Sequence, residues 1–142
     1  MLSAVAIKGM AVTKMVARFA DGRVVKGTAR HFDLASHSID LFVTSGSETQ
    51  RRTRIQTQDL KALFGVKSLV GDPGHANSND FGDPCPPRGA VRVTFLDGEI
   101  LVGVAAGHDP VAEGFYLIPA DDQSNNEWCY VVQAATQEVC PV

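Results

Sequence analysis

The residues with the clearest chemical potential are basic side chains in the first half of the chain. Arg51, Arg52 and Arg54 stand together in a polar turn, and Lys26 and Arg30 come from a neighbouring predicted strand. Guanidinium groups pair with phosphate through two parallel hydrogen bonds, and a basic stripe is the electrostatic footprint of an anionic partner. These five residues are therefore the candidates for a possible anion-binding site.

Stacking side chains are sparse around this basic cluster. Only Phe32 and Phe42 are placed to act as platforms, whereas proteins that bind single-stranded nucleic acid interleave aromatic rings with positive charge. A protein partner or a second copy of the chain is thus the favoured partner. Nucleic acid, or another anion bound through the basic half, is the alternative.

Other polar clusters resemble catalytic or metal sites only loosely. His31, Asp33 and His37 carry metal-ligand groups without a recognised ligand spacing, and residues 121–127 are acidic without the spacing of a calcium loop. Cys129 and His108 could pair as nucleophile and base, but Cys129 stands between aromatic residues in the acidic half and is expected to be buried. The sequence predicts no enzymatic activity, no metal and no cofactor.

The chain contains the same segment twice. The stretch Phe19 to Ala29 returns as Phe95 to Ala105, and the spacing that separates Asp21 from Asp97 holds without a gap to the C-terminus. We call this constant spacing the repeat offset. A register kept that long predicts one structural unit that was duplicated and makes up nearly the whole molecule.

The two copies differ strongly in charge. Residues 14–67 hold ten Lys and Arg against five Asp and Glu, whereas residues 89–142 hold one Arg against eight acids. Such asymmetry concerns association and partners rather than fold. It is explained by two solvated surfaces, by docking of one half on the other, or by an anion that binds the first half.

Length and composition indicate an ordinary globular chain. The 142 residues are 44% hydrophobic and 20% charged. We expect neither a signal peptide nor a membrane span, and three cysteines without a CxxC pair favour a reducing cytoplasm. We expect a first basic domain at 1–70, a linker rich in Gly and Pro at 71–89, and a second acidic domain at 90–142. Neither half would bury a generous core alone, so the two are expected to pack together.

Each copy alternates apolar and polar residues as half-buried strands do. Asp-Gly pairs predict hairpin turns after Phe19 and Phe95, and Gly27 and Gly103 predict sharply bent second strands. Further strands are expected at 38–44 and 52–57, and at 114–120 and 128–133, where Pro119 marks an edge or the end of pairing. We also expect a helical turn at 59–64 and a strand at 66–70, whereas the second copy ends without a fifth strand. Residues 2–8 are then expected to pair with the uncovered edge, or to form a frayed tail.

Residues 15–44 resemble the first motif of the Sm-like fold, a small SH3-like barrel of five strands. The resemblance rests on a strand, an Asp-Gly turn, a bent strand with Gly27, the pair Phe32-Asp33 and a further apolar strand. It implies an all-β protein of two tandem SH3-like or Sm-like barrels. The family's RNA-binding Asn and Arg-Gly pair are missing at 34–38 and 52–55.

The second copy is similar to an uncharacterised bacterial domain that carries comparable strings at Val91–Gly103, Gly114–Asp121 and Ser124–Val139. This second resemblance implies a bacterial origin and no activity. Together these expectations describe a bacterial cytoplasmic protein of unknown function, most simply a non-enzymatic interaction or regulatory module.

Overall fold

The structure is a computed structural model that describes residues 12–45, 49–71, 74–82, 85–105, 108–109 and 111–142. All regular elements of this described part are strands or single 3₁₀ turns, which confirms the prediction of an all-β protein. The first half contains β1 (Thr13–Phe19), β2 (Val24–Ala29), η1 (Leu34–Ser36), β3 (Ser38–Ser45), β4 (Thr49–Gln56), η2 (Thr57–Asp59) and β5 (Leu60–Val66). The second half contains β6 (Ala90–Phe95), β7 (Ile100–Ala105), β8 (Gly114–Pro119), β9 (Asn126–Val132), η3 (Gln133–Ala135) and β10 (Thr136–Pro141).

Two Asp-Gly turns open the two halves in the same way. Gly22 and Gly98 have φ angles of 98° and 93°, a region that glycine adopts without steric cost. The amide of Phe19 donates to the carbonyl of Arg23 at 2.9 Å, and the corresponding bond from Phe95 to Glu99 measures 2.8 Å. The predicted hairpins between β1 and β2 and between β6 and β7 are therefore confirmed.

The strands form one antiparallel sheet in the order β10-β6-β7-β8-β9-β5-β1-β2-β3-β4. Within it, the order β5-β1-β2-β3-β4 of the first half returns as β10-β6-β7-β8-β9 in the second. The cross-strand register repeats as well: Met15 pairs with Gly27 and Val91 with Gly103, while Thr28 pairs with Phe42 and Val104 with Ile118. The repeat offset read from the sequence thus also relates equivalent structural positions.

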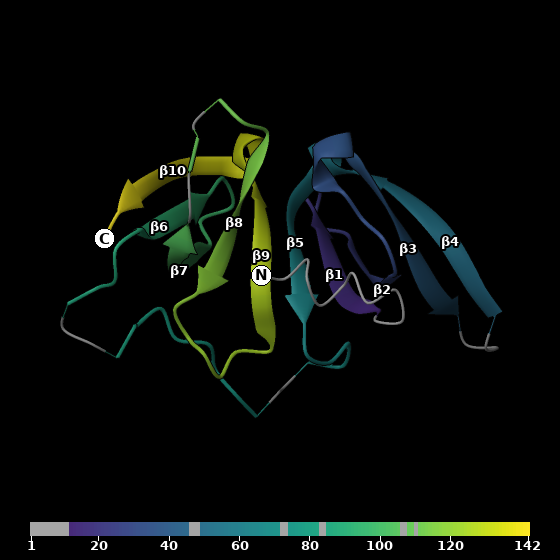
Figure 1. The fold of residues 1–142 in the computed structure, drawn as a ribbon, viewed down its shortest axis with the longest axis horizontal. Helices are drawn as coiled ribbons and strands as arrows, with labels where there is room; N and C mark the ends of the chain where they lie inside the picture. Colours follow the sequence, from purple (N-terminus) through teal and green to yellow (C-terminus); the bar gives the residue numbers. More distant parts are fainter. Residues whose placement is uncertain (1–11, 46–48, 72–73, 83–84, 106–107, 110) are drawn as a thin grey trace.

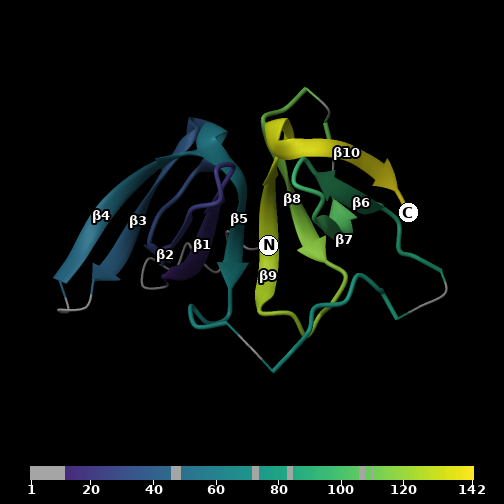
Figure 2. The ribbon, with the colours of Figure 1, turned by 180° about the vertical axis from the view of Figure 1, so that it is seen from behind.

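The sheet is open, so the expectation of two closed barrels is not confirmed. After η2 the chain does not return to pair β5 with β4 of its own half. Instead β5 lies between β1 and β9, and the two halves meet along the pair β5–β9, which we call the seam. Figures 1 and 2 show the two halves side by side, with β5 and β9 adjacent at the centre of the molecule.

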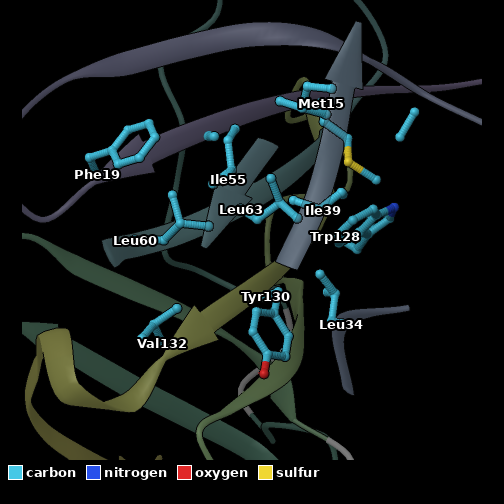
Figure 3. Close-up of a cluster of buried hydrophobic side chains, with 13 residues drawn as sticks. Met15, Phe19, Leu34, Ile39, Ile55, Leu60, Leu63, Trp128, Tyr130 and Val132 are labelled. Carbon is cyan, nitrogen blue, oxygen red and sulfur yellow. The ribbon is translucent and has the colours of Figure 1, made fainter. Parts of the chain in front are cut away.

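Each half completes the hydrophobic core of the other at the seam. Side chains of β9, namely Trp128, Tyr130 and Val132, enter the core of the first half, where Met15, Leu34, Ile39 and Leu63 are also buried (Figure 3). In return Ala62, Phe64 and Val66 of β5 enter the core of the second half with Phe95 and Leu117. The two copies therefore pack together as expected, and they do so by exchanging core side chains.

The outer strands β4 and β10 are the counterparts of the seam strands but lack their apolar side chains. At the repeat offset, Trp128, Tyr130 and Val132 of β9 correspond to Arg52, Arg54 and Gln56 of β4. Likewise Ala62, Phe64 and Gly65 of β5 correspond to Glu138, Cys140 and Pro141 of β10. Charged residues and proline on an edge strand oppose pairing with another chain.

Proline at position 141 acts directly on the outer edge. The amide of Val142 donates to the carbonyl of Ala90 in the inner neighbour β6 at 3.1 Å. Because backbone groups alternate in direction along a strand, residue 141 directs its backbone outwards, where proline offers no N–H. The strand that begins the sheet is therefore blunted at its exposed side.

Several predicted boundaries differ from the structure. The expected helical turn at 59–64 is wrong, because β5 covers most of it, and residues 67–70 follow β5 outside any strand. The second copy does have a fifth strand, β10, which pairs with β6. The prediction for residues 2–8 lies outside the described residues. Pro119 ends β8, in agreement with the expected end of pairing.

The described residues of 71–89 form no helix or strand but are fastened to the second half. His75 Nε2 lies 2.6 Å from Asp121 Oδ2, and the same carboxylate oxygen accepts the amide of Ser78 at 3.0 Å. The side chain of Asn79 bonds the backbone of β7 through Ile100 and Val102. Within the described residues, no helix is both long and apolar enough to cross a membrane.

Candidate functional site

Successive side chains of β4 point to opposite faces of the sheet, so the three arginines that are neighbours in the sequence are separated. Ile55 is 2% exposed and faces the core of the first half, so Arg51 and Thr53 lie on that same side of the strand. Arg52 and Arg54 point to the outer side of the sheet. The expected anion-binding cluster is therefore divided between two faces, and only Arg52 and Arg54 remain neighbours.

Arg54 is already engaged on the sheet surface. Its Nε donates to Asp40 Oδ1 at 3.0 Å and its second guanidinium nitrogen to Oδ2 at 3.3 Å. The hydrogen bond from Arg54 lowers the pKa of Asp40, and the same bond raises the pKa of Arg54. Arg52 pairs across the sheet with Phe42 and is exposed.

Lys26 and Arg30 come from β2 and the residue that follows it, with β3 between them and β4. Lys26 projects from β2 on the outer side of the sheet and, together with Arg18, lines a pocket beside the seam. Arg30 is exposed directly after the last residue of β2. Lys26, Arg52 and Arg54 thus share the outer side of the sheet, whereas Arg51 lies on the other side of β4.

A larger groove lies across the seam, on the side of the sheet that carries Tyr130. We call it the seam groove. It has a volume of about 420 Å³ and is lined by Asp33, Leu34, Ala35 and His37 of the first half and by Ala112, Glu113, Gly114, Phe115, Tyr116 and Tyr130 of the second half. Both halves of the chain therefore contribute to it.

Short polar contacts fix the acidic rim of the seam groove. Thr57 Oγ1 donates to Glu113 Oε1 at 2.6 Å, and His37 Nδ1 lies 3.3 Å from Glu113 Oε2. Asp33 caps η1 by accepting the amide of Ala35 at 3.0 Å. His37 ends that turn in the left-handed region, at φ 67°, which brings it opposite Glu113.

Aromatic rings form the wall of the groove. Tyr116 packs edge-on against Trp128 and Tyr130, with ring centroids 5.7 and 5.4 Å apart, and Trp128 stacks on Phe32 at 5.9 Å. Tyr116 as a whole residue remains 38% exposed. Because Trp128 and Tyr130 are anchored in the core of the first half, they hold Tyr116 in a fixed orientation.

The electrostatics of the groove favour positive charge. Burial, followed by the negative charge of Asp33, raises the pKa of Tyr116, and burial, followed by the charge of Glu113, raises the pKa of Tyr130. Both phenols therefore stay neutral, while two carboxylates stand beside aromatic faces that carry negative quadrupole potential. The groove is suited to a cationic group.

Sequence reasoning did not find this groove. Tyr116, Tyr130 and Glu113 are far from Asp33 and His37 in the sequence, and only the pairing of β5 with β9 brings them together. The available signal was that Trp128 and Tyr130, two residues apart, lie on the same side of one strand. Two large aromatic side chains in these positions need another part of the protein to shield them from water. That cover is the first half of the molecule.

Cys129 and His108, which the sequence does not support as a catalytic pair, each pack among side chains of the second half. Cys129 is fully buried in the core of the second half, as predicted, and burial raises the pKa of its thiol. His108 lies 2.9 Å from Gln133 Oε1 and packs against Phe115. In the described part of the chain, no group of three His, Cys, Asp or Glu is arranged to hold a metal ion.

These features define an all-β protein with two structurally equivalent halves in one antiparallel sheet and a groove at their seam. Residues 11–141 match a family of unknown function, DUF6982, and the chain belongs to this family. No curated protein and no solved structure matches the chain.

Proposed function

We propose that the protein is a non-enzymatic interaction module that binds a cationic side chain of a partner protein in the seam groove. The observation that carries the proposal is the position of two carboxylates, Asp33 and Glu113, around the exposed ring of Tyr116. A Lys or Arg side chain placed there gains cation–π and charge-assisted contacts at once. Aromatic-lined grooves are also a recurring means of peptide recognition.

The composition of the groove supports binding rather than catalysis. Among the described residues that line it there is no serine, cysteine or lysine that could act as a nucleophile. Its histidine is directed to Glu113 rather than to a group that it could activate. We accordingly propose that the module has no enzymatic activity.

The proposal can be tested with small defined probes. N-acetyl-lysine methylamide and its trimethylammonium form should bind saturably, whereas the analogue with an acetylated, neutral side chain should not. The fluorescence of Trp128, the single tryptophan of the chain, reports occupancy because its ring touches Tyr116. Equal response to the neutral analogue would contradict recognition of the cation.

Matched variants separate the groove from the rest of the sheet. Tyr116→Ala should reduce affinity at least tenfold, while Ile118→Ala, which truncates an exposed neighbour on the same side of β8, should leave it unchanged. Asp33→Asn and Glu113→Gln retain the cap and the bond from Thr57 but remove charge, so each should weaken binding. A tenfold loss in Ile118→Ala as well would assign the effect to the strand and not to the groove.

A second candidate is an anion or nucleic-acid binder that works through the outer face of the first half. Phe42 supports it, because this half-buried ring lies between Thr28 and Arg52 on the same face that bears Lys26. Retardation of single-stranded RNA at low salt, lost when Arg52 and Arg54 are changed to Ser, would favour this function. An intact chain that retards neither RNA nor DNA would exclude it.

We also propose that each half is related to Sm-like and SH3-like barrels and that the module acts in a bacterial cytoplasm. The strand order β5-β1-β2-β3-β4, which returns in the second half, supports the first part of this proposal. Both halves would then be opened forms of such a barrel, each joined to the other along the seam. The blunted strands β4 and β10 favour a protein partner over self-association of the whole chain.

A further inference from the structure

A second pocket lies beside the seam on the opposite side of the sheet from the seam groove. Its floor includes Val16 of β1 and Phe64 of β5, which are direct cross-strand neighbours. Phe64 in turn pairs with Cys129 of β9, whereas the seam groove is formed on the side of Tyr130, the next residue along β9. Because successive side chains of a strand alternate, the two sites are separated by the sheet itself.

Two cations of the first half lie on the rim of this pocket. Lys26 is the cross-strand partner of Val16, and Arg18 lies two residues from Val16 on the same side of β1. The guanidinium carbon of Arg18 is 5.9 Å from the centre of the Phe64 ring, which holds Arg18 over the pocket floor. The rim therefore offers two converging positive charges above an apolar surface.

Among the described residues that line this pocket, Glu99 is the one carboxylate, and it is paired with a lysine. Glu99 forms an ion pair with Lys61, which also lies 2.7 Å from Asp97 and is only 12% exposed along its side chain. Burial lowers the pKa of Lys61, but the hydrogen bonds that its ammonium donates to Asp97 and Glu99 raise the pKa overall, so its charge persists. Within the described residues, no ion pair engages Arg18 or Lys26, so both side chains are available to a ligand of the pocket.

The opposite wall supplies amide groups from the second half and the preceding loop. Asn125 fastens the chain after β5 by accepting the amide of Ser68 at 3.0 Å and donating to its carbonyl at 2.9 Å. Asn77 and Asn126 line the pocket next to it. Amide nitrogens there add neutral donors to the two cations.

We propose that this pocket, which we call the Arg18–Lys26 pocket, binds a phosphoryl group. Two cations of different length match the double charge of a phosphate monoester, and arginine binds phosphate through paired donors. A volume of about 170 Å³ is small beside the usual ligand pockets of roughly 300–1,000 Å³. It suits inorganic phosphate or the phosphorylated end of a larger molecule, with the floor of Val16 and Phe64 taking the first carbon atoms.

The test is a titration of the full chain by nuclear magnetic resonance at constant ionic strength, with inorganic phosphate and with phenyl phosphate. The signal of Arg18 Nε and the methyl signals of Val16 should shift saturably. Tighter binding of phenyl phosphate assigns the pocket to a phosphate monoester, and tighter binding of inorganic phosphate assigns it to the free ion. Shifts that grow linearly with both probes would overturn the proposal.

Single charge removals provide the control. Arg18→Gln and Lys26→Gln should each weaken binding at least tenfold, with a melting temperature close to that of the wild type. Arg52→Gln removes the same charge from the outer face of β4, outside the pocket, and should leave the affinity unchanged. Equal weakening in all three variants would show diffuse attraction to a basic half and would refute a built site.

Discussion

Gly65 of β5 and Trp128 of β9 face each other across the seam, and the indole fills the space that a Cβ atom on residue 65 would occupy. This relationship allows Trp128 to reach Phe32 in the first half and to support Tyr116 in the seam groove. One glycine therefore sets the closeness of the two halves and the position of the aromatic wall.

Replacing Gly65 by Ala should destabilise the protein by about 1–3 kcal/mol, because the new methyl group overlaps the indole. The cost should fall when Trp128 is first changed to Phe, since a smaller ring leaves space for the methyl group. Chemical denaturation of the four chains of this double-mutant cycle measures the coupling. Additive free energies of unfolding would show that the two residues do not compete for the same volume.

The central glycines of β2 and β7 should also resist enlargement. A Cβ at Gly27 would come within 2.7 Å of the carbonyl oxygen of Phe42, and at Gly103 it would collide with that of Ile118. Gly27→Val and Gly103→Val should each cost about 1–3 kcal/mol through strain. Lys26→Ala, at an exposed neighbour, provides the control for thermal unfolding. Melting temperatures as unaffected in the glycine variants as in this control would disprove the close approach.

Grafting seam residues onto the outer strands should create a new interface between copies. Arg52→Trp, Arg54→Tyr and Gln56→Val give β4 the apolar side of β9, while Glu138→Ala, Cys140→Phe and Pro141→Gly give β10 that of β5. Because such a head-to-tail contact joins unlike edges, association should continue beyond a dimer.

Sedimentation analysis over a range of concentrations measures this association. The chain with both grafts should show a mass that rises with concentration, whereas chains with one graft should behave as the wild type does. A double graft that sediments as the wild type does would show that side chains of the outer strands are not what limits pairing.

The contact between Asp121 and the loop before β6 should make the stability of the protein depend on pH. The hydrogen bond from His75, together with the amides of Ser78 and Gln123, lowers the pKa of Asp121. A lowered folded pKa gives stability that is complete above the unfolded value of about 3.9 and is lost as the pH falls through the folded value.

Asp121→Asn should therefore melt below the wild type at pH 6, and the difference should shrink as the pH falls below about 4. Differential scanning calorimetry at several pH values measures it. Asp122→Asn, a change at the exposed neighbour, should show no such convergence. A constant gap between pH 6 and pH 2 would contradict the contribution of the ionised carboxylate.

Local chemistry and the internal repeat predicted much of the fold. The Asp-Gly turns, the close backbone approach at Gly27 and Gly103 and the burial of Cys129 depend on neighbours in sequence or on alternation along one strand. These are the features that a sequence pattern records directly. Their positions in the structure follow the repeat offset in both halves.

The seam was not predicted because its strands do not alternate. Leu60–Val66 is buried along nearly its whole length, since one side faces each core, and such a continuous apolar run has no period of two. The pattern therefore predicts a helical turn followed by a strand, which β5 contradicts. The sequence signal for the seam lies in the comparison of two equivalent strands. Trp128 and Tyr130 of β9 stand where β4 has Arg52 and Arg54, so only β9 is apolar on both sides.

The division of the arginine cluster between two faces of β4 was not predicted for a related reason, and anion binding by these residues stays a prediction. Neighbours in sequence were treated as neighbours on a surface, but a strand sends Arg51 and Arg52 to opposite faces. The residues of the seam groove depend on pairing between β5 and β9 and on the loop that carries Glu113. No spacing along the chain encodes their proximity.

The exchange of core side chains at the seam also determines when the first half can fold during synthesis. A ribosome completes all five strands of the first half well before it adds Trp128, Tyr130 and Val132. Until then the nascent first half exposes Leu63 and its apolar neighbours, and the edge of β5 has no partner. The native state can therefore form only when nearly all residues have been translated. Before that, the incomplete chain exposes the most apolar surface and has the greatest need of chaperones.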